Sequence, residues 1–279
     1  MTIVAAIQML SQADLAANLA QAEQLLVNAV AEGAKLVVLP EVFAMFSSTR
    51  QREIAEQEAG ESPPIQNWLA EISRRYQIWI VAGTIPLLVE GEATRVAAAS
   101  LVYDDQGVQR ARYDKIHLFD VDVADGQGSY RESDNFVAGN KPLTIDTPYG
   151  RLGVAVCYDI RFPELFRLML DEGMEILAVP AAFTLHTGEA HWLALLKARA
   201  IENQIYVIGA NQGGEHTAKR KTSGGSVIID PWGLVLAEAA RGEAFITSSI
   251  DLARLQVIRC NMPIAKHRRF SVNAKPGLL

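Results

Sequence analysis

The chain alternates short, wholly apolar runs with longer stretches in which apolar residues recur every three or four positions. Residues 36–39 form one such run, and residues 14–32 carry their apolar side chains on one helical face. Because a strand is apolar throughout only when both of its faces are buried, the short runs predict strands enclosed between other layers. The longer stretches predict amphipathic helices that cover those strands. This alternation favours an α/β fold.

No low-complexity linker interrupts the pattern, so we expect residues 1–279 to form a single domain with one large core, built either as one unit or as two fused halves. The expected strands cover residues 3–8, 35–41, 78–85, 153–156, 176–179, 205–210, 226–230, 234–237 and 244–250, with a hairpin over 101–112. The expected helices cover residues 14–32, 65–76, a segment ending at 171, and 189–203, followed by a short helix and an extended tail from residue 261.

Two segments of the chain resemble each other: residues 31–43 (AEGAKLVVLPEVF) and residues 171–183 (DEGMEILAVPAAF). In both, a Gly precedes an apolar run that ends in Pro, but only the first copy has an acid after the Pro. This similarity indicates two related halves. Two such halves would pack sheet against sheet with their helices outside.

Composition narrows the function classes. The formal net charge of −6 and the pI of about 5.5 argue against a nucleic-acid-binding surface. No apolar stretch reaches the roughly 18 residues that a membrane span needs, and residues 1–5 do not begin a secretion signal, so we expect a cytoplasmic protein. Cys157 and Cys260 are too few for a disulfide framework, and Cys260 is expected to be an ordinary thiol.

Cys157 follows the apolar run 153–156 and precedes the sequence YDIRFPE. Pro163 in that sequence suits the first turn of a helix, where a missing N–H costs nothing. The expected strand-to-helix junction would place the thiol beside unpaired backbone N–H groups and the positive end of a helix dipole, which favour thiolate. Cys157 is therefore a candidate nucleophile, although a packed core cysteine would fit the same pattern.

Two further segments carry isolated charges in apolar surroundings. The run KLVVLPE, residues 35–41, ends in a carboxylate at the carboxyl end of a strand, so Glu41 is a candidate general base. In YDKIHLFD, residues 113–120, Lys115 is a candidate cation in a dry site. Taken separately, Glu41 could be a solvated loop end and Lys115 a surface side chain with a buried stem. The order Glu, Lys, Cys makes those separate explanations less attractive.

These three segments resemble the signatures of the nitrilase superfamily of carbon-nitrogen hydrolases, and the resemblance extends over nearly the whole chain. It implies a four-layer α-β-β-α sandwich, a homodimer or higher homo-oligomer, and a Glu–Lys–Cys triad. In that triad Glu41 is the base, Lys115 stabilises the tetrahedral intermediate and Cys157 is the nucleophile. Glu132 falls where many members carry a second glutamate that positions the lysine and the substrate. The three matching stretches are LPE at 39–41, DKIH at 114–117 and VCYD at 156–159, and Glu132 lies in YRES at 130–133.

The chemistry of amide hydrolysis agrees with these roles. A thioester mechanism needs a nucleophile, a proton donor for the departing amine, and positive charge where the oxyanion develops. Glu41 can take the Cys157 proton, pass it to the leaving nitrogen and then activate water. Lys115 supplies the charge together with the backbone N–H of Tyr158. No cofactor is needed for this reaction.

Substrate choice is inferred from further likeness to the deaminated-glutathione amidase branch, whose substrate is an anionic 2-oxo acid amide. The stretch 183–188 (FTLHTG) makes Thr184 and Thr187 candidate binding residues, beside Tyr158 and Arg161 near the nucleophile. Arg161 is the favoured partner for a substrate carboxylate, because arginine suits bidentate recognition. The loop 215–221 (EHTAKRK) offers Lys219, Arg220 and Lys221 as alternatives or as solvated surface cations. Gly225 stands where that branch commonly has His.

Other functions fit parts of the sequence. An ω-amidase that acts on 2-oxoglutaramate shares the acyl half of the substrate, and an N-carbamoyl amino acid hydrolase is a more distant alternative. Cys157 with His186 or His191 and Asn211 has the order of a papain-like protease but no local protease signature. The two histidines are five residues apart, which is not the spacing of a zinc helix, so no metal is expected. A binding protein without activity would have to retain the triad unused.

Overall fold

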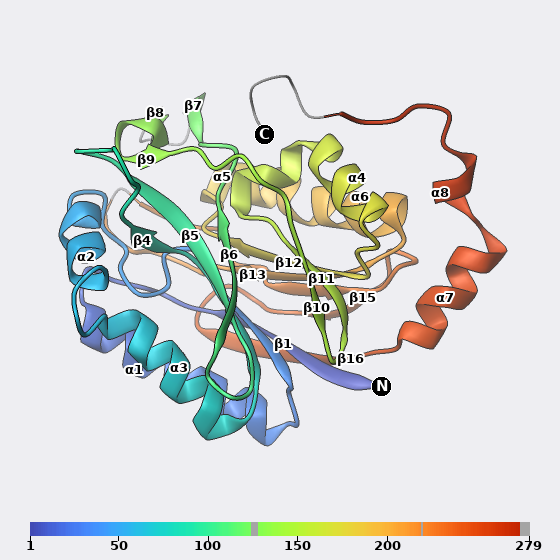
Figure 1. Ribbon diagram of the computed structural model, residues 1–279, viewed down its shortest axis with the longest axis horizontal. Coiled ribbons are helices and arrows are strands. Elements are labelled where there is room, and N and C mark those ends of the chain that lie inside the picture. The colour runs from blue at the N-terminus through green and yellow to red at the C-terminus, as the bar shows by residue number, and fades with distance from the viewer. Residues whose placement is uncertain (124–127, 219, 274–279) are drawn as a thin grey trace.

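The computed structural model describes residues 1–123, 128–218 and 220–273. Two β-sheets lie face to face, and helices cover the outer face of each, so the order of layers is α-β-β-α (Figure 1). The first sheet has the order β16-β1-β2-β3-β5-β4, with β6 and β9 also paired to β5, and the second has the order β10-β11-β12-β13-β14-β15. Strands β7 and β8 form a separate pair. The α/β class and the sandwich of four layers expected from the sequence are confirmed.

The strands are β1 (Thr2–Gln8), β2 (Leu36–Leu39), β3 (Trp79–Ala82), β4 (Ile85–Leu87), β5 (Val96–Tyr103), β6 (Gln109–Asp114), β7 (Asp120–Val123), β8 (Gly128–Arg131), β9 (Phe136–Val137), β10 (Leu143–Thr147), β11 (Gly150–Val154), β12 (Ile176–Ala181), β13 (Tyr206–Asn211), β14 (Val227–Ile229), β15 (Val235–Glu238) and β16 (Ala244–Ile250). The α-helices are α1 (Leu15–Ala31), α2 (Gln51–Glu58), α3 (Pro64–Tyr76), α4 (Pro163–Asp171), α5 (Leu185–Thr187), α6 (Leu193–Asn203), α7 (Leu252–Asn261) and α8 (Ile264–His267). Two 3-10 turns, Glu132–Asp134 and Cys157–Arg161, and a π-helical turn, Gly188–Trp192, complete the elements.

Strand β2 explains why the short runs are wholly apolar. Leu36 and Val38 belong to the core that the first sheet shares with the second sheet. Val37 and Leu39, on the opposite face, belong to the core beneath α1 and α3. Because both faces of this strand are buried, its side chains do not alternate between apolar and polar. The first charged residue, Glu41, comes only after the strand has ended.

The two segments that resemble each other in sequence have the same local structure. Gly33 and Gly173 have φ angles of +92° and +91°, a region open mainly to glycine. Each lies between a helix and a strand, α1 and β2 in the first copy and α4 and β12 in the second. Strands β2 and β12 are central in their sheets, with parallel neighbours on both sides. The two strands therefore present their carboxyl ends in equivalent positions.

Four segments differ from the secondary structure expected from the sequence. The strand expected over 78–85 is broken into β3 and β4, because the chain turns at Gly83 with φ of +49°. A Cβ at Gly83 would lie 2.0 Å from the Pro40 carbonyl oxygen, so the turn requires glycine. The helix expected over 189–203 begins with the π-helical turn, and α2 was not expected. The tail expected to be extended from residue 261 contains α8.

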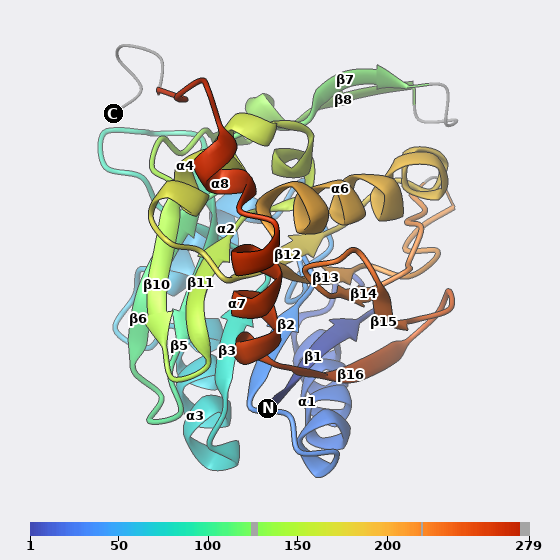
Figure 2. The same cartoon turned by 90° about the vertical axis from the view of Figure 1, so that its right-hand side faces the viewer.

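Helices α7 and α8 run along one side of the sandwich, as the view in Figure 2 shows. They follow β16, which returns to the first sheet and pairs antiparallel with β1. In the part of the chain that the structure describes, no helix combines the length and apolar character required to cross a membrane.

Candidate active site

Glu41 lies directly beyond the carboxyl end of β2, and its surroundings hold it from both sides. Its side-chain Oε2 accepts a hydrogen bond from the Ala182 backbone N–H at 2.9 Å, and its carbonyl accepts one from the Gln212 side chain at 3.0 Å. Val42 has φ of +53°, a strained conformation for a β-branched residue, and its N–H donates to Thr84 Oγ1 at 3.0 Å. The sharp turn after Glu41 thus aims the carboxylate between the two sheets.

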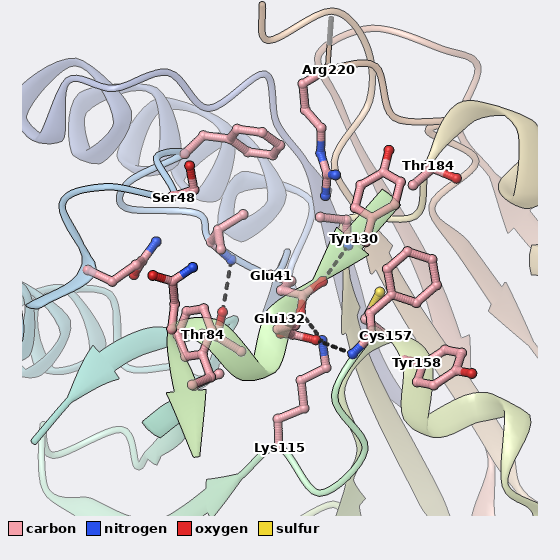
Figure 3. A pocket seen from close by; sticks show the side chains of 18 of the residues that line it. Glu41, Ser48, Thr84, Lys115, Tyr130, Glu132, Cys157, Tyr158, Thr184 and Arg220 are labelled. Atoms are coloured by element: carbon pink, nitrogen blue, oxygen red, sulfur yellow. Dashed lines mark hydrogen bonds and ion pairs between the residues drawn. The ribbon is translucent and has the colours of Figure 1, made fainter. Parts of the chain in front are cut away.

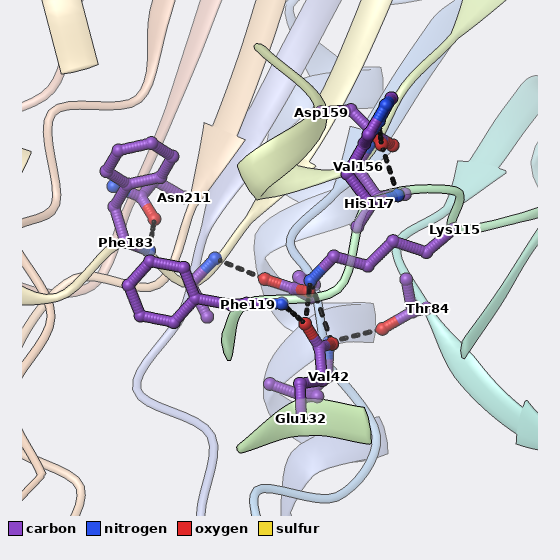
Figure 4. Close-up of polar contacts among 12 residues, drawn as sticks. Val42, Thr84, Lys115, His117, Phe119, Glu132, Val156, Asp159, Phe183 and Asn211 are labelled. Atoms are coloured by element: carbon purple, nitrogen blue, oxygen red, sulfur yellow. Dashed lines mark hydrogen bonds and ion pairs between the residues drawn. The ribbon is translucent and has the colours of Figure 1, made fainter. Parts of the chain in front are cut away.

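Lys115 follows β6 and is the bridge between two carboxylates. Its Nζ donates to Glu41 Oε1 at 2.8 Å and to Glu132 Oε1 and Oε2 at 2.8 and 2.9 Å (Figures 3 and 4). The side chain is only 2% exposed. Burial alone would lower the pKa of Lys115, but the charges of Glu132, Glu41 and Cys157 together outweigh it and raise that pKa well above its ordinary value. Lys115 is therefore a fixed cation at neutral pH.

Glu132 opens the 3-10 turn that follows β8, and its carboxylate is also held by a backbone donor. The Phe119 N–H donates to Glu132 Oε2 at 2.6 Å. Burial raises the pKa of Glu132, and the negative charge of Glu41 adds to the effect against the opposing influence of Lys115. Glu132 thus gives the Lys115 ammonium a second carboxylate partner beside Glu41.

Cys157 begins the 3-10 turn Cys157–Arg161 with φ of +48°, a conformation that L-residues rarely adopt. The helix α4 starts six residues later at Pro163, as expected, so the thiol is not at the N-terminus of that helix. Burial and the charge of Glu41 raise the pKa of the Cys157 thiol well above its ordinary value, against the opposing effect of Lys115. The α4 N-terminus expected to favour thiolate is therefore not beside Cys157, and burial and Glu41 favour the protonated thiol instead.

Asp159 lies within the VCYD motif, had no predicted role, and connects the segments that carry Cys157 and Lys115. Its Oδ2 accepts hydrogen bonds from Val156 N at 2.8 Å and from the Tyr113 hydroxyl at 2.7 Å. Its Oδ1 accepts from the backbone N–H and the Nδ1 of His117 at 2.9 and 2.7 Å (Figure 4). The sequence does contain a signal for this role, because Asp159 is a charged residue in an otherwise apolar motif. A carboxylate that is buried there must have hydrogen-bond or charged partners.

Glu41, Lys115, Glu132 and Cys157 all line one cavity of about 620 Å³ (Figure 3). Aromatic rings form much of its wall, and polar residues lie along the rest. The aromatic lining residues are Phe46, Phe119, Tyr130, Phe136, Tyr158 and Phe183, and the polar ones include Ser47, Ser48, Gln51, Thr84, Asn135 and Thr217. The structure thus brings the four expected catalytic residues together in a concave, largely apolar site.

The candidate substrate-binding residues divide into two groups. Tyr158, Thr184 and Thr187 line the cavity, and the two threonine hydroxyls lie 2.8 Å apart. Arg161 is not among the lining residues. Its guanidinium lies over the rings of Tyr158 and Phe183, with its Cζ 5.8 and 5.6 Å from their centroids. Arg161 therefore backs the wall of the cavity rather than forming it.

The basic loop contributes Arg220 to the cavity lining. Lys221 is instead paired with Glu215 at 2.6 Å, and Lys219 lies outside the described residues. Gly225 is not a lining residue: its φ of +72° favours glycine, and its carbonyl accepts a hydrogen bond from the Trp192 indole at 2.7 Å.

The residues of the alternative protease arrangement have other partners. His191 Nδ1 lies 3.2 Å from an Arg161 guanidinium nitrogen, and neither His186 nor His191 lines the cavity. Asn211 accepts a hydrogen bond from the Phe183 N–H at 3.0 Å and donates to the Gly224 carbonyl at 2.7 Å (Figure 4). Within the described ranges, no three His, Cys, Asp or Glu side chains are grouped so that they could hold a metal ion.

This chain is similar to known proteins in both sequence and structure. The family model "Carbon-nitrogen hydrolase" matches residues 3–259. The deaminated glutathione amidase of Yersinia enterocolitica is 42% identical over 276 residues, which cover 99% of this chain and 96% of that protein. The human omega-amidase NIT2 is 37% identical, with 92% and 91% covered. The crystal structure of the C. elegans NitFhit protein superposes with a TM-score of 0.88 at 37% identity, covering 96% of this chain and 65% of that one.

Proposed function

This chain belongs to the carbon-nitrogen hydrolase family, and we propose that it hydrolyses deaminated glutathione to 2-oxoglutarate and a dipeptide through a thioester on Cys157. It is a hydrolase that acts on the carbon–nitrogen bonds of linear amides. The observation that carries the proposed mechanism is the position of Lys115 Nζ, held between Glu41 and Glu132 in the cavity that Cys157 lines.

Acylation begins with a proton transfer, because the Cys157 thiol is protonated at rest. Glu41 takes the proton as the sulfur attacks the amide carbonyl of the substrate. The oxyanion that forms is stabilised by the Lys115 ammonium and by the backbone N–H of Tyr158. Glu41 then gives the proton to the leaving nitrogen, the carbon–nitrogen bond breaks, and the acyl group remains on the sulfur as a thioester.

Deacylation repeats these steps with water. Glu41 takes a proton from the water molecule as the water oxygen attacks the thioester carbonyl. Lys115 again stabilises the oxyanion, and Glu132 keeps the ammonium in place throughout. The carbon–sulfur bond breaks, the thiol regains its proton from Glu41, and the acid is released.

The size of the cavity supports a substrate larger than a small primary amide. Sites for drug-sized ligands have volumes of roughly 300–1,000 Å³, and the cavity here is about 620 Å³. We assign Tyr158, Thr184 and Thr187 to the acyl half of the substrate. The positive charge of Arg161 lies behind the Tyr158 and Phe183 rings. This charge favours a substrate whose acyl half carries a carboxylate.

The test is the release of 2-oxoglutarate from deaminated glutathione and from 2-oxoglutaramate, compared as kcat/KM for the wild type and for Cys157→Ala. The proposal expects a higher value for deaminated glutathione and the loss of both activities in the variant. A preference for 2-oxoglutaramate would instead identify an ω-amidase, the activity that the name of the 37% identical human relative gives.

The site of action and the assembly are part of the same proposal. We infer a cytoplasmic enzyme in which residues 1–279 form one domain, and a homodimer, as the family resemblance implies. Light scattering of the purified protein tests the dimer, and a monomeric mass over the working concentration range would refute it.

A further inference from the structure

Among the described residues, five charged side chains line the cavity, and four of them are already paired. Lys115 lies between Glu41 and Glu132, as described above. Arg131 donates to Asp122 Oδ1 at 2.9 Å and to two backbone carbonyls. The remaining cation is Arg220, which has no carboxylate partner among residues 1–123, 128–218 and 220–273. Because Lys115 is outnumbered by carboxylates, an anionic substrate needs this additional positive charge.

The Arg220 guanidinium is held by aromatic rings rather than by an acid. Its Cζ lies 4.7 Å from the centroid of Tyr130 and 5.8 Å from that of Phe46. The Phe46 ring is itself stacked on His216, with centroids 3.8 Å apart and planes within 4°. The His216 side chain is anchored to Ser11 O and to Thr222 Oγ1, each at 2.8 Å. This support orients the guanidinium, and no described residue accepts a hydrogen bond from its N–H groups, which can therefore bind a ligand.

The backbone around Arg220 is also fixed. Its carbonyl accepts a hydrogen bond from His216 N at 3.0 Å, and its N–H donates to Thr217 Oγ1 at 3.0 Å. Arg220 reaches into the cavity beside Tyr130, whereas Tyr158 and the turn that carries Cys157 form a different wall (Figure 3). Arg161 and Arg220 are therefore separated: Arg161 backs the wall formed by Tyr158 and Phe183, and Arg220 lies with Phe46 and Tyr130.

Deaminated glutathione has one carboxylate on each side of its scissile amide: one on the 2-oxo acyl half and one at the end of the leaving dipeptide. We propose that Arg220 binds the carboxylate of the leaving dipeptide and thereby selects deaminated glutathione over 2-oxoglutaramate, whose leaving group is ammonia. This inference rests on the proposed function. It makes Arg220 a specificity-determining residue that acts during acylation, because the dipeptide departs before the thioester is hydrolysed.

The experiment pairs a variant with a substrate analogue. The kcat/KM values of the wild type and Arg220→Gln are measured on deaminated glutathione, on deaminated glutathione with its terminal carboxylate converted to the primary amide, and on 2-oxoglutaramate. A charge-assisted contact of about 1.5–3 kcal/mol corresponds to a loss of about 10- to 100-fold. We expect Arg220→Gln to lose that factor on deaminated glutathione. On the amide analogue the wild type and the variant should be nearly equal, and on 2-oxoglutaramate the variant should lose far less.

Lys221→Gln is the matched control, because Lys221 belongs to the same loop but pairs with Glu215 and does not line the cavity. Its substrate preference should equal that of the wild type. Equal losses of Arg220→Gln on all three substrates, or no loss on any, would overturn the inference while leaving the proposed function in place. If the wild type does not hydrolyse deaminated glutathione, the proposed function itself fails, and the assignment of Arg220 fails with it.

Discussion

The carboxylate of Asp159 lies 2.7 Å from the Tyr113 hydroxyl and so joins the turn that carries Cys157 to the strand that leads to Lys115. Asp159 is fully buried, and three further donors, from Val156 and His117, point at the same carboxylate. One side chain therefore keeps Cys157 and Lys115, the proposed nucleophile and the proposed oxyanion-stabilising cation, in a fixed relation.

Replacing Asp159 by Asn should uncouple these two segments. The Asn amide keeps one acceptor oxygen but replaces the other with an NH₂ group. The donors that face this NH₂ group then lack an acceptor, and each group left unpaired lowers the free energy of unfolding by about 1–3 kcal/mol. We expect the free energy of unfolding, measured by urea denaturation, to fall by about 3 kcal/mol, and kcat to fall while KM changes little. Tyr113→Phe removes only one of these hydrogen bonds and should cost about 1 kcal/mol. Equal stability of Asp159→Asn and the wild type would contradict this role.

Lys115→Ala removes the charge that we propose stabilises the oxyanion in both half-reactions. Loss of one such donor lowers turnover by about 10²–10³-fold, so kcat on deaminated glutathione should fall by at least that factor. His191→Ala is the matched comparison, because His191 contacts Arg161 and does not line the cavity. A protease of the Cys–His–Asn type would show the reverse order, with His191→Ala the more damaged of the two.

The Cys157 thiol should react slowly with iodoacetamide at neutral pH, because only the thiolate is an effective nucleophile and the pKa of Cys157 is raised by burial and by Glu41. The alkylation rate should still be rising above pH of about 8.5, where an ordinary thiol is half ionised. Glu41→Gln removes one cause of the raised pKa, so it should speed alkylation at neutral pH while abolishing amidase activity. Slower alkylation in Glu41→Gln would show that the carboxylate does not oppose ionisation of the thiol.

Stability should depend on pH through His216. Burial, assisted by the charge of Arg220, lowers the pKa of His216 from 6.5 to about 4. Between those values the unfolded chain binds a proton that the folded protein does not, so stability is complete above about 6.5 and is lost as the pH falls. From about pH 7 to about pH 5 the loss should be about 2 kcal/mol. Urea denaturation of His216→Gln at the same two pH values should lack this component, and an identical pH dependence of both proteins would refute it.

The sequence predicted Glu41, Lys115, Glu132 and Cys157 as catalytic residues because each is a chemically distinctive residue next to an apolar run or within a family motif, and the structure places all four in one cavity. It also predicted the layers, since residues such as Leu36 and Val37 are apolar on both faces of one strand. These features depend on residue type and on short-range order, and both can be read directly from the chain.

What could not be predicted depends on backbone conformation and on contacts between distant segments. The positive φ angles of Val42 and Cys157 are not favoured by those residue types; the surrounding structure imposes them. The resting thiol was missed because its pKa depends on burial and on Glu41, which is far away in the sequence. Arg220 stood among similar cations in one loop, and only its place over Tyr130 and Phe46 distinguishes it from Lys221.

The central claim is that one acyl group on Cys157 is common to the reactions of both substrates, and methanol tests it most directly. Methanol competes with water for the thioester and yields a methyl ester of 2-oxoglutarate beside the free acid. Because the leaving group has departed by then, the ratio of ester to acid should be the same from deaminated glutathione and from 2-oxoglutaramate, and Cys157→Ala should form neither product. Different ratios from the two substrates, or product formed by Cys157→Ala, would contradict the account.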